Sequence, residues 1–137
     1  MAREILFKAK RLDNGKWVEG QYLLIKEKVY IILEAETSCM DSENTDLYAT
    51  QWHEVMPETL CRYIGLTDKN ENKIWENDIV EVPGEYEYFK IEWENDSARY
   101  VMNGDSLVVD FDNYCSYEVE VIGNIFDNSE LLEEANG

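Results

Sequence analysis

The sequence has no apolar run near the roughly 18 residues that a membrane-spanning helix requires, and its N-terminus, MAREILFKAKR, lacks the apolar core of a secretory signal peptide. Its three cysteines, Cys39, Cys61 and Cys115, are far apart in the chain, and their spacing fits neither a zinc site nor a disulfide framework. We therefore expect a cytoplasmic protein with reduced, mostly buried thiols and no membrane association.

Residues and motifs typical of enzymes are also scarce. The single histidine, His53, has no cysteine near it in the sequence, and no phosphate-binding loop, dinucleotide fingerprint or serine-nucleophile motif is present. The segment that starts at Asp68 imitates a calcium loop, but Lys73 and Ile79 stand where the glycine and the bidentate glutamate are required. We interpret that segment as a β-turn. The sequence supports no enzymatic activity and no cofactor.

Basic residues are also scarce. The 137 residues contain 12 Lys and Arg against 30 Asp and Glu, a net charge of −18, and no basic residue follows Arg99. Residues 1–28 hold seven basic and four acidic residues, whereas residues 29–137 hold five basic and 26 acidic ones. An acidic body repels nucleic acid, whose phosphates require cations. Three interpretations stay open: a surface for a basic partner protein, a decoy that mimics DNA, and charge that only maintains solubility.

The sequence is rich in patterns that are typical of β-strands and hairpin turns. Hydrophobic residues at 45 % and aromatic residues at 12 % are enough to build a core despite the charge. Two Asn-Gly dipeptides, at Asn14 and Asn103, predict hairpins with two-residue turns. The predicted pairs are Lys10 with Glu19 and Phe7 with Tyr22 in the first hairpin, and Tyr100 with Leu107 and Ala98 with Val109 in the second.

Alternation predicts further strands, and the fold class that follows is mainly β. A polar loop is expected over 34–46, and Asn128 or Ser129 is expected to cap one short C-terminal helix. In the strand over 85–94, Phe89 and Trp93 are expected to fill the core. The other expected strands cover 29–33, 47–55, 73–82 and 116–126.

Two groups of residues are candidates for a binding site. Tyr86 and Tyr88 lie in a stretch rich in glutamate, which suggests an aromatic, acidic groove for a basic peptide. Carboxylates from two expected strands form the second group, which would meet a basic partner or hold the divalent cation of a metal-dependent hydrolase. Its members are Asp110, Asp112, Glu118 and Glu120. An exposed strand edge would also permit a homo-oligomer.

Two runs, RYIGLTDKNENKIWENDIVEV (62–82) and VEVIGNIFDNSELLE (119–133), resemble the YopX family of phage and prophage proteins. The chain departs from the usual pattern at Glu71-Asn72 and at Asn77, where glycine-containing turns are usual, at Trp75, where tyrosine is usual, and at Ser129, where proline often starts the helix. Asn72 and Asn77 are expected to supply the positive φ angles in place of glycine. The signature positions that match include Tyr63, Gly65, Leu66, Asp68, Asp78, Ile79, Val80, Gly123 and Asn124.

The resemblance implies a fold and an origin but no activity, since the family is uncharacterised. It implies a single β domain over 1–137, with hairpins and a polar loop in 1–60 and a small Src-homology-3-like barrel in 61–137. It also implies a phage- or prophage-encoded protein in a bacterial host. The signature residues are expected to be structural. The leading hypothesis is a non-catalytic protein-interaction module with an acidic surface.

Overall fold

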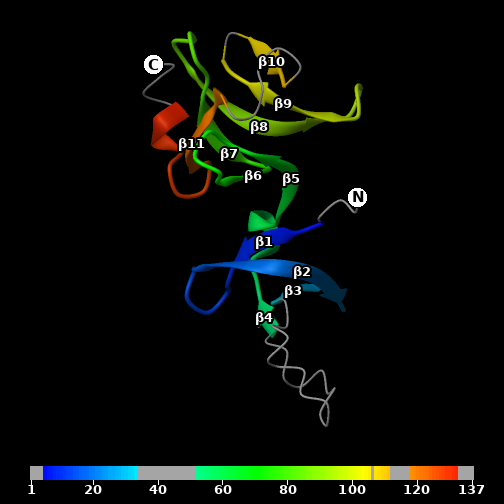
Figure 1. The fold of residues 1–137 in the computed structure, drawn as a ribbon. Helices are drawn as coiled ribbons and strands as arrows, with labels where there is room; N and C mark the ends of the chain where they lie inside the picture. Colours follow the sequence, from blue (N-terminus) through cyan, green and yellow to red (C-terminus); the bar gives the residue numbers. More distant parts are fainter. Residues whose placement is uncertain (1–4, 34–51, 106, 112–117, 133–137) are drawn as a thin grey trace. The chain divides into compact units, whose positions relative to one another are not determined.

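The computed structural model describes residues 5–33, 52–105, 107–111 and 118–132 (Figure 1). The chain forms two compact units, Met1–Arg62 (unit 1) and Tyr63–Gly137 (unit 2). The strands form two antiparallel sheets, which confirms the mainly β class. In the part of the chain that is described, no helix is long and apolar enough to span a membrane.

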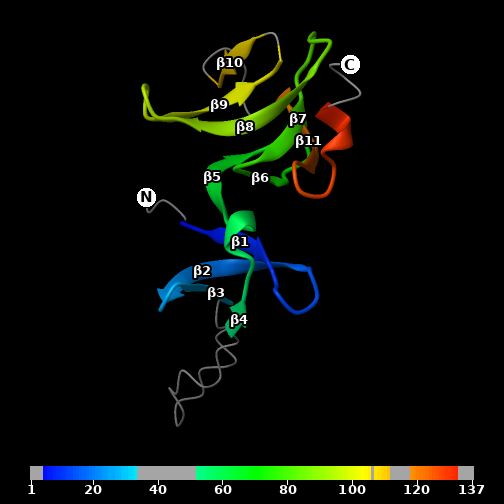
Figure 2. The same cartoon turned by 180° about the vertical axis from the view of Figure 1, so that it is seen from behind.

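Unit 1 is built from antiparallel strands, of which β1 to β4 lie side by side in the order of the chain and β5 lies beside β1 (Figures 1 and 2). Their order in space is β4-β3-β2-β1-β5, and the 3₁₀ turn η3 at Pro57–Thr59 leads from β4 to β5. The expected strands over 29–33 and 47–55 appear as β3 and, within the described residues, as β4; the expected loop over 34–46 lies outside those residues. The strands are β1 (Phe7–Lys10), β2 (Trp17–Ile25), β3 (Lys28–Ile32), β4 (Trp52–Glu54) and β5 (Cys61–Thr67).

The core of unit 1 comes from one face of these strands. Ala9, Val29, Ile31 and Val55 are buried and packed together, because β-strand side chains alternate between faces and these four share one. Beyond β4, a single bridge joins Val55 to Arg11 at the end of β1. Two backbone hydrogen bonds flank this bridge, from the Leu12 N–H to the Glu54 carbonyl at 2.9 Å and from the Met56 N–H to the Lys10 carbonyl at 2.8 Å, so the end of β4 also contacts the end of β1.

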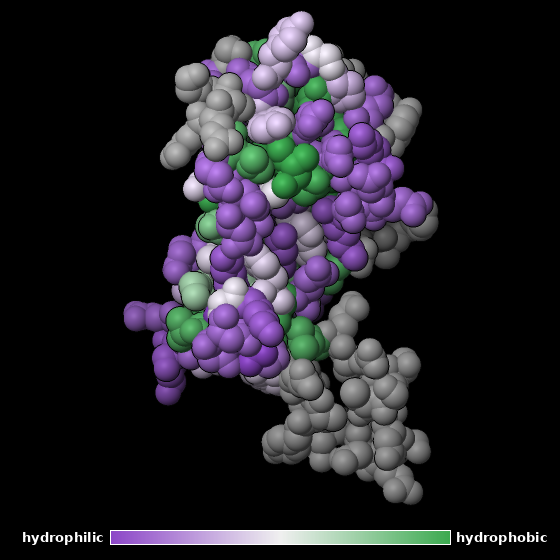
Figure 3. Space-filling view, turned by 90° about the vertical axis from the view of Figure 1, so that its left-hand side faces the viewer, coloured by the Kyte–Doolittle hydropathy of each residue, from purple (hydrophilic) through white to green (hydrophobic). Residues whose placement is uncertain are grey.

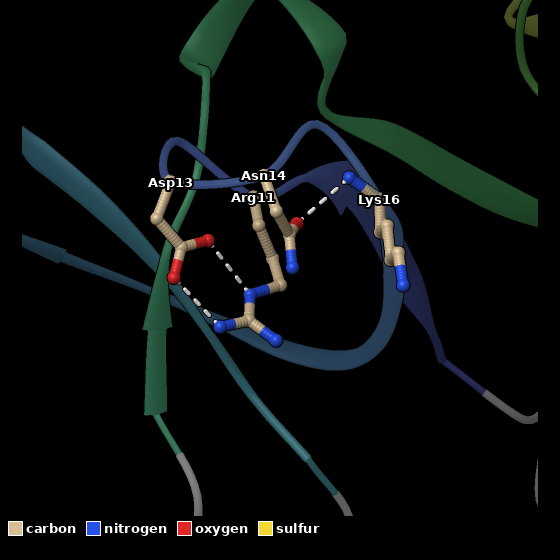
Figure 4. A network of polar contacts seen from close by, with 4 residues as sticks. All are labelled: Arg11, Asp13, Asn14 and Lys16. Carbon is tan, nitrogen blue, oxygen red and sulfur yellow. Dashed lines mark hydrogen bonds and ion pairs between the residues drawn. The ribbon is translucent and has the colours of Figure 1, made fainter.

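The first hairpin is present, but its predicted register was wrong by two residues. Lys10 pairs with Trp17 and Phe7 with Gly20. Gly15 has a positive φ of 71° but Asn14 does not, so the two-residue turn that needs both is absent. The Asn14 side chain instead accepts a hydrogen bond from the Lys16 N–H at 2.9 Å, inside a longer loop (Figure 4).

A shift of two residues leaves every side chain on its predicted face. The Phe7 and Tyr22 rings therefore still meet, now as diagonal neighbours whose centroids are 4.7 Å apart. Lys8 and Lys10 lie on the opposite face with Trp17, and their ammonium groups lie 4.6 and 5.5 Å from its ring centroid.

The turn between β2 and β3 was not predicted, because it contains neither asparagine nor glycine. Ile25 pairs with Lys28 across the two turn residues Lys26 and Glu27, whose φ angles are +48° and +72°. Two positive φ angles are typical of the type I′ hairpin turn. Each costs an ordinary L-residue roughly 1–2 kcal/mol, so this turn stores strain at an exposed position.

Replacing this turn pair, as Lys26→Asn with Glu27→Gly, is expected to stabilise the protein by about 1 kcal/mol, since Asn-Gly adopts the type I′ turn with less strain. Urea unfolding of the double variant measures the gain. The reversed order, Lys26→Gly with Glu27→Asn, removes the same charges and is expected to gain less. Equal or lower stability of the Asn-Gly variant would contradict the assignment of strain.

Unit 2 contains the C-terminal part of β5, which pairs with β6 (Lys73–Trp75), and a five-stranded antiparallel sheet in the order β10-β9-β8-β7-β11. One face of this five-stranded sheet carries the core, with Phe89, Ile91 and Met102 fully buried. A short helix begins at Glu130, close to its predicted cap. The strands of the five-stranded sheet are β7 (Asp78–Glu81), β8 (Tyr88–Glu94), β9 (Arg99–Asn103), β10 (Val108–Asp110) and β11 (Glu120–Asn124).

The single strand predicted over 73–82 is in fact two strands. Asn77 lies in the turn between them with a φ of +72°, and the Asp78 carboxylate accepts a 2.8 Å hydrogen bond from the Trp75 N–H. Asn77 thus supplies a positive φ as expected. In the preceding turn, Glu71 rather than Asn72 does so, with a φ of +66°.

The second predicted hairpin is present with a register four residues away from the predicted one. Asn103 pairs with Val108 and Met102 with Val109, so Gly104 lies at the end of the strand pair rather than inside the turn. A Cβ atom on Gly104 would lie 2.7 Å from the ring of buried Phe89. Glycine is required here for close packing, not for a positive φ.

Two other expectations were wrong. Trp93 shares the face of Phe89 and Ile91 but is 46 % exposed at the end of β8, where it packs edge-on against Tyr100 with 5.0 Å between ring centroids.

The expected barrel is also absent from the described residues. The five-stranded sheet of unit 2, where the barrel was expected, is open, because β10 and β11 are its two unpaired edges.

Candidate protein-binding surface

The five-stranded sheet of unit 2 has one face toward the core, and its opposite face carries most of the charged side chains of the sheet. Strand register places these residues together: Glu81 faces Tyr88 and Glu120, Glu94 faces Arg99, and Glu92 and Asp110 both face Val101. We call this surface the outer face. It contains the carboxylates of Glu81, Glu92, Glu94, Asp110 and Glu120. Ile79 and Val101 also belong to it and are buried.

Ion pairs fix most of these carboxylates in place. Arg99 lies between two strands, 2.9 Å from Asp110 and 3.8 Å from Glu94. Lys90 lies 3.0 Å from Glu92, and Lys69 lies 3.3 Å from Glu120. Exposed pairs of this kind contribute little stability. Their effect is to order the carboxylates and to offset part of their charge.

The Glu92 carboxylate has two partners, the Asn103 amide and the Lys90 ammonium group. Partial burial on its own would raise its pKa, but hydrogen bonds from the Asn103 amide and from Lys90, together with the charge of Lys90, lower the pKa below its usual value. The bond from Asn103 is 2.7 Å long. Glu92 is therefore ionised over the physiological range.

Glu81 differs from the other four carboxylates. No basic side chain among the described residues forms an ion pair with it, and it lies directly opposite Glu120. Like charges at opposed positions of an antiparallel pair repel. On its other side Glu81 faces the half-buried ring of Tyr88. Glu81, Tyr88 and Glu120 thus form a polar group with an unbalanced negative charge.

The predicted carboxylate cluster does not assemble. Asp110 is on β10 and Glu120 is on β11, which are opposite edges of the sheet, and each has its own basic partner. Glu118 is exposed just before β11, and Asp112 lies outside the described residues. No group of three or more potential metal ligands occurs within the described ranges.

The two candidate tyrosines also separate. Tyr88 lies on the outer face, whereas Tyr86 lies in the loop before β8 and is fully exposed. A fully exposed tyrosine beside Glu85 and Glu87 is available to a partner but forms no wall of a groove. Sequence reasoning missed Glu81 and Lys69, because only the order of β7 and β11 and the 68–72 turn brings them to the outer face.

On the face shown in Figure 3, hydrophilic side chains predominate, and hydrophobic ones form small separate patches. Large apolar patches mark hydrophobic interfaces.

Among the signature residues, Asp68 has the most demanding role. Its carboxylate is 2 % exposed and accepts hydrogen bonds of 2.9 Å from three backbone N–H groups, those of Asn70, Asn72 and Val121. Burial alone would raise the pKa of Asp68, but these hydrogen bonds outweigh burial and lower it. With the Lys69 N–H, which donates to the Val119 carbonyl at 3.0 Å, they hold the turn against the start of β11.

The other signature positions also serve the fold. Gly123 leaves room for the Asn128 side chain, which would lie within 3 Å of a Cβ atom there. The Asn124 side chain accepts hydrogen bonds of 2.9 Å from the N–H groups of Phe126 and Asp127. Tyr63 packs against Trp75 with 5.6 Å between ring centroids. Ile79 and Val80 are fully buried, and Gly65 has a φ of +92°.

Comparisons with known proteins agree with this architecture. The family model described as YopX protein matches residues 6–133. The crystal structure of protein EF1440 from Enterococcus faecalis is similar, with a TM-score of 0.56 and 20 % sequence identity over 96 % of this chain and 99 % of that one. At that identity the likeness concerns the fold alone. No curated protein matches the sequence.

Proposed function

The chain belongs to the YopX family, and from that premise we propose that it is a non-catalytic, phage- or prophage-encoded module that binds a basic protein through the outer face of unit 2. The observation that carries this proposal is the place of the charge. Residues 63–137 contain four basic and 19 acidic residues, a net −15 out of the total −18. Such a field accelerates encounter with a positively charged surface.

The outer face supplies contacts as well as a field. Glu81 and Glu120 repel each other across the strand pair, so a Lys or Arg of a partner would relieve that repulsion. The adjacent Tyr88 ring offers a surface for the same cation. The polar group of Glu81, Tyr88 and Glu120 is therefore the centre that we expect the partner to contact.

The arrangement favours this function over a decoy that mimics DNA. DNA presents regularly spaced, unpaired charges. On the outer face, four of the five carboxylates form ion pairs with three basic residues, since Glu94 and Asp110 share Arg99. A partner that reads single carboxylates beside an aromatic ring fits this surface better than a partner that tracks a phosphate backbone.

Reversing one charge, with Glu81→Lys, is expected to reduce partner capture at least about fivefold, because it removes the unpaired carboxylate and places a cation beside Glu120. The tagged protein is incubated with host lysate at low and moderate salt, and captured proteins are quantified by mass spectrometry. The variant is expected to be no less stable than the parent, since an opposed Lys–Glu pair replaces an opposed Glu–Glu pair.

The matched control is Glu58→Lys, which makes the same change in net charge at an exposed position of unit 1. Capture of one protein by the parent and by this control, but not by the Glu81 variant, supports the proposal. Equal loss in both variants would mean that only total charge matters. No partner at moderate salt in any growth phase would contradict the interaction module itself.

A further inference from the structure

Unit 1 contains a hollow that the proposed function does not use. Its volume is about 300 Å³, and it is lined by Leu12, Asp13, Trp52, His53 and Glu54. The first two residues belong to the loop between β1 and β2, and the others form β4. A hydrogen bond of 2.9 Å from the Leu12 N–H to the Glu54 carbonyl joins the two segments.

The apolar walls of the hollow are exposed to an unusual degree. Leu12 is 54 % and Trp52 is 41 % exposed, although burial of such side chains is favourable. The Trp52 indole is positioned by an edge-on contact with Tyr30, whose ring centroid lies 6.4 Å away. A positioned, accessible indole is the best aromatic platform for a cation.

The polar side chains that line the hollow are two carboxylates, Asp13 and Glu54, and the imidazole of His53. Asp13 is held by the Arg11 guanidinium through bonds of 3.0 and 2.7 Å (Figure 4), and this pairing lowers the pKa of Asp13. The charges of Arg11 and Asp13 therefore offset each other. Glu54 has no ion-pair partner among the described residues, and it leaves the hollow with one uncompensated carboxylate next to an indole.

We propose that this hollow binds a guanidinium group, as carried by an arginine side chain. A guanidinium is planar and weakly hydrated, so it stacks on an indole and donates paired hydrogen bonds to a carboxylate. Trp52 supplies the stacking surface, Glu54 accepts the hydrogen bonds, and Leu12 covers the aliphatic stem. The neighbouring Arg11–Asp13 pair shows the carboxylate half of this geometry, a guanidinium that donates two hydrogen bonds to one carboxylate.

Titration of ¹⁵N-labelled full-length protein with N-acetyl-arginine amide tests the proposal by NMR. We expect saturable shifts centred on residues 12–13 and 52–54, with a dissociation constant in the millimolar range, because one partly exposed ion pair and one cation–π contact give weak binding. N-acetyl-citrulline amide has the same shape without the charge. It is expected to cause no saturable shift.

Two variants and one control separate this site from general charge attraction. Glu54→Gln is expected to weaken binding at least about fivefold, and Trp52→Leu is expected to do the same through loss of stacking. Glu58→Gln removes an exposed carboxylate of unit 1 outside the hollow and is expected to bind like the parent. Amide spectra of each variant report whether it is folded.

Three results would overturn the inference. They are no saturable shift at tens of millimolar ligand, equal binding of the citrulline amide, and equal weakening by Glu54→Gln and Glu58→Gln. The Glu81→Lys variant is expected to bind the arginine amide normally, since Glu81 lies in unit 2. Failure of this site therefore leaves the outer-face proposal standing, and the reverse is also true.

Discussion

Replacing Asp68 with alanine is expected to lower the free energy of unfolding by about 3–5 kcal/mol. The loss is large because three backbone N–H groups lose their acceptor at once. The carboxylate is 2 % exposed, so water does not readily replace it. Urea unfolding of the parent and the variant measures the difference.

Asp68→Asn separates the shape of the side chain from its charge. The amide oxygen can still accept from Asn70 and Asn72, but the amide nitrogen would face the Val121 N–H, so two donors would meet. We expect a loss of about 2 kcal/mol, intermediate between the parent and the alanine variant. Amide exchange is expected to increase most at Val121 and at the start of β11.

The same carboxylate predicts a pH dependence. Its pKa in the folded state lies below the ordinary value of 3.8, so the stabilisation that it provides is fully present above the unfolded pKa. That stabilisation is lost as the pH falls through the folded pKa. The difference in unfolding free energy between the parent and Asp68→Asn should be constant above about pH 5 and should shrink in more acidic solution.

Asp96→Asn is the matched control, because it makes the same chemical change at an exposed turn residue. Its effect is expected to stay within about 0.5 kcal/mol at every pH. If the control and Asp68→Asn were equally destabilised, the role of the three N–H groups would be refuted.

Replacing Gly20 with alanine is the second large effect, about 3 kcal/mol of destabilisation. The Cβ atom would lie 2.0 Å from the Ile32 carbonyl oxygen, and that obstacle is backbone. A flexible side chain can turn away from an added methyl group, but a backbone carbonyl in a strand pair cannot move without disturbing the pairing of β2 with β3. Gly20 is buried beside β1 as well, where it pairs with Phe7.

Gly84→Ala is the informative comparison for this prediction. A Cβ atom there meets nothing within 4 Å, but the φ of +82° strains any side chain. We expect a cost of about 1 kcal/mol from that conformation alone. A Gly20 variant as stable as the Gly84 variant would show that the β2–β3 pair adapts, and amide exchange at Ile31 and Ile32 would reveal how.

Several elements could be predicted because their signals are local. A run of β-branched, apolar residues predicts β3, alternation of apolar and polar residues predicts β8 and β11, and the asparagine at 77 predicts a residue with positive φ. The type I′ turn at Lys26 and Glu27 could not be predicted, because its residues oppose the conformation that they adopt. There the pairing of β2 with β3 overrides local preference.

The candidate site was predicted less well than the fold. The expected carboxylate cluster required β10 and β11 to be neighbours, and the sheet order separates them. The residues that do meet, Glu81 with Glu120 and Tyr88, are far apart in sequence and come together only through the pairing of β7 with both its neighbours. Trp93 shares a strand face with Phe89, but the core ends before it.

The sequence by itself determined the mainly β class, most of the strands, the face of each side chain in the first hairpin, the family and the excess of negative charge. Only the tertiary structure decided the hairpin registers, the edges of the sheets and which carboxylates have a basic partner. The physical reason is the range of each signal. Side-chain alternation has a period of two residues and survives a register shift of two, whereas register and strand order depend on loop geometry and on contacts between distant residues.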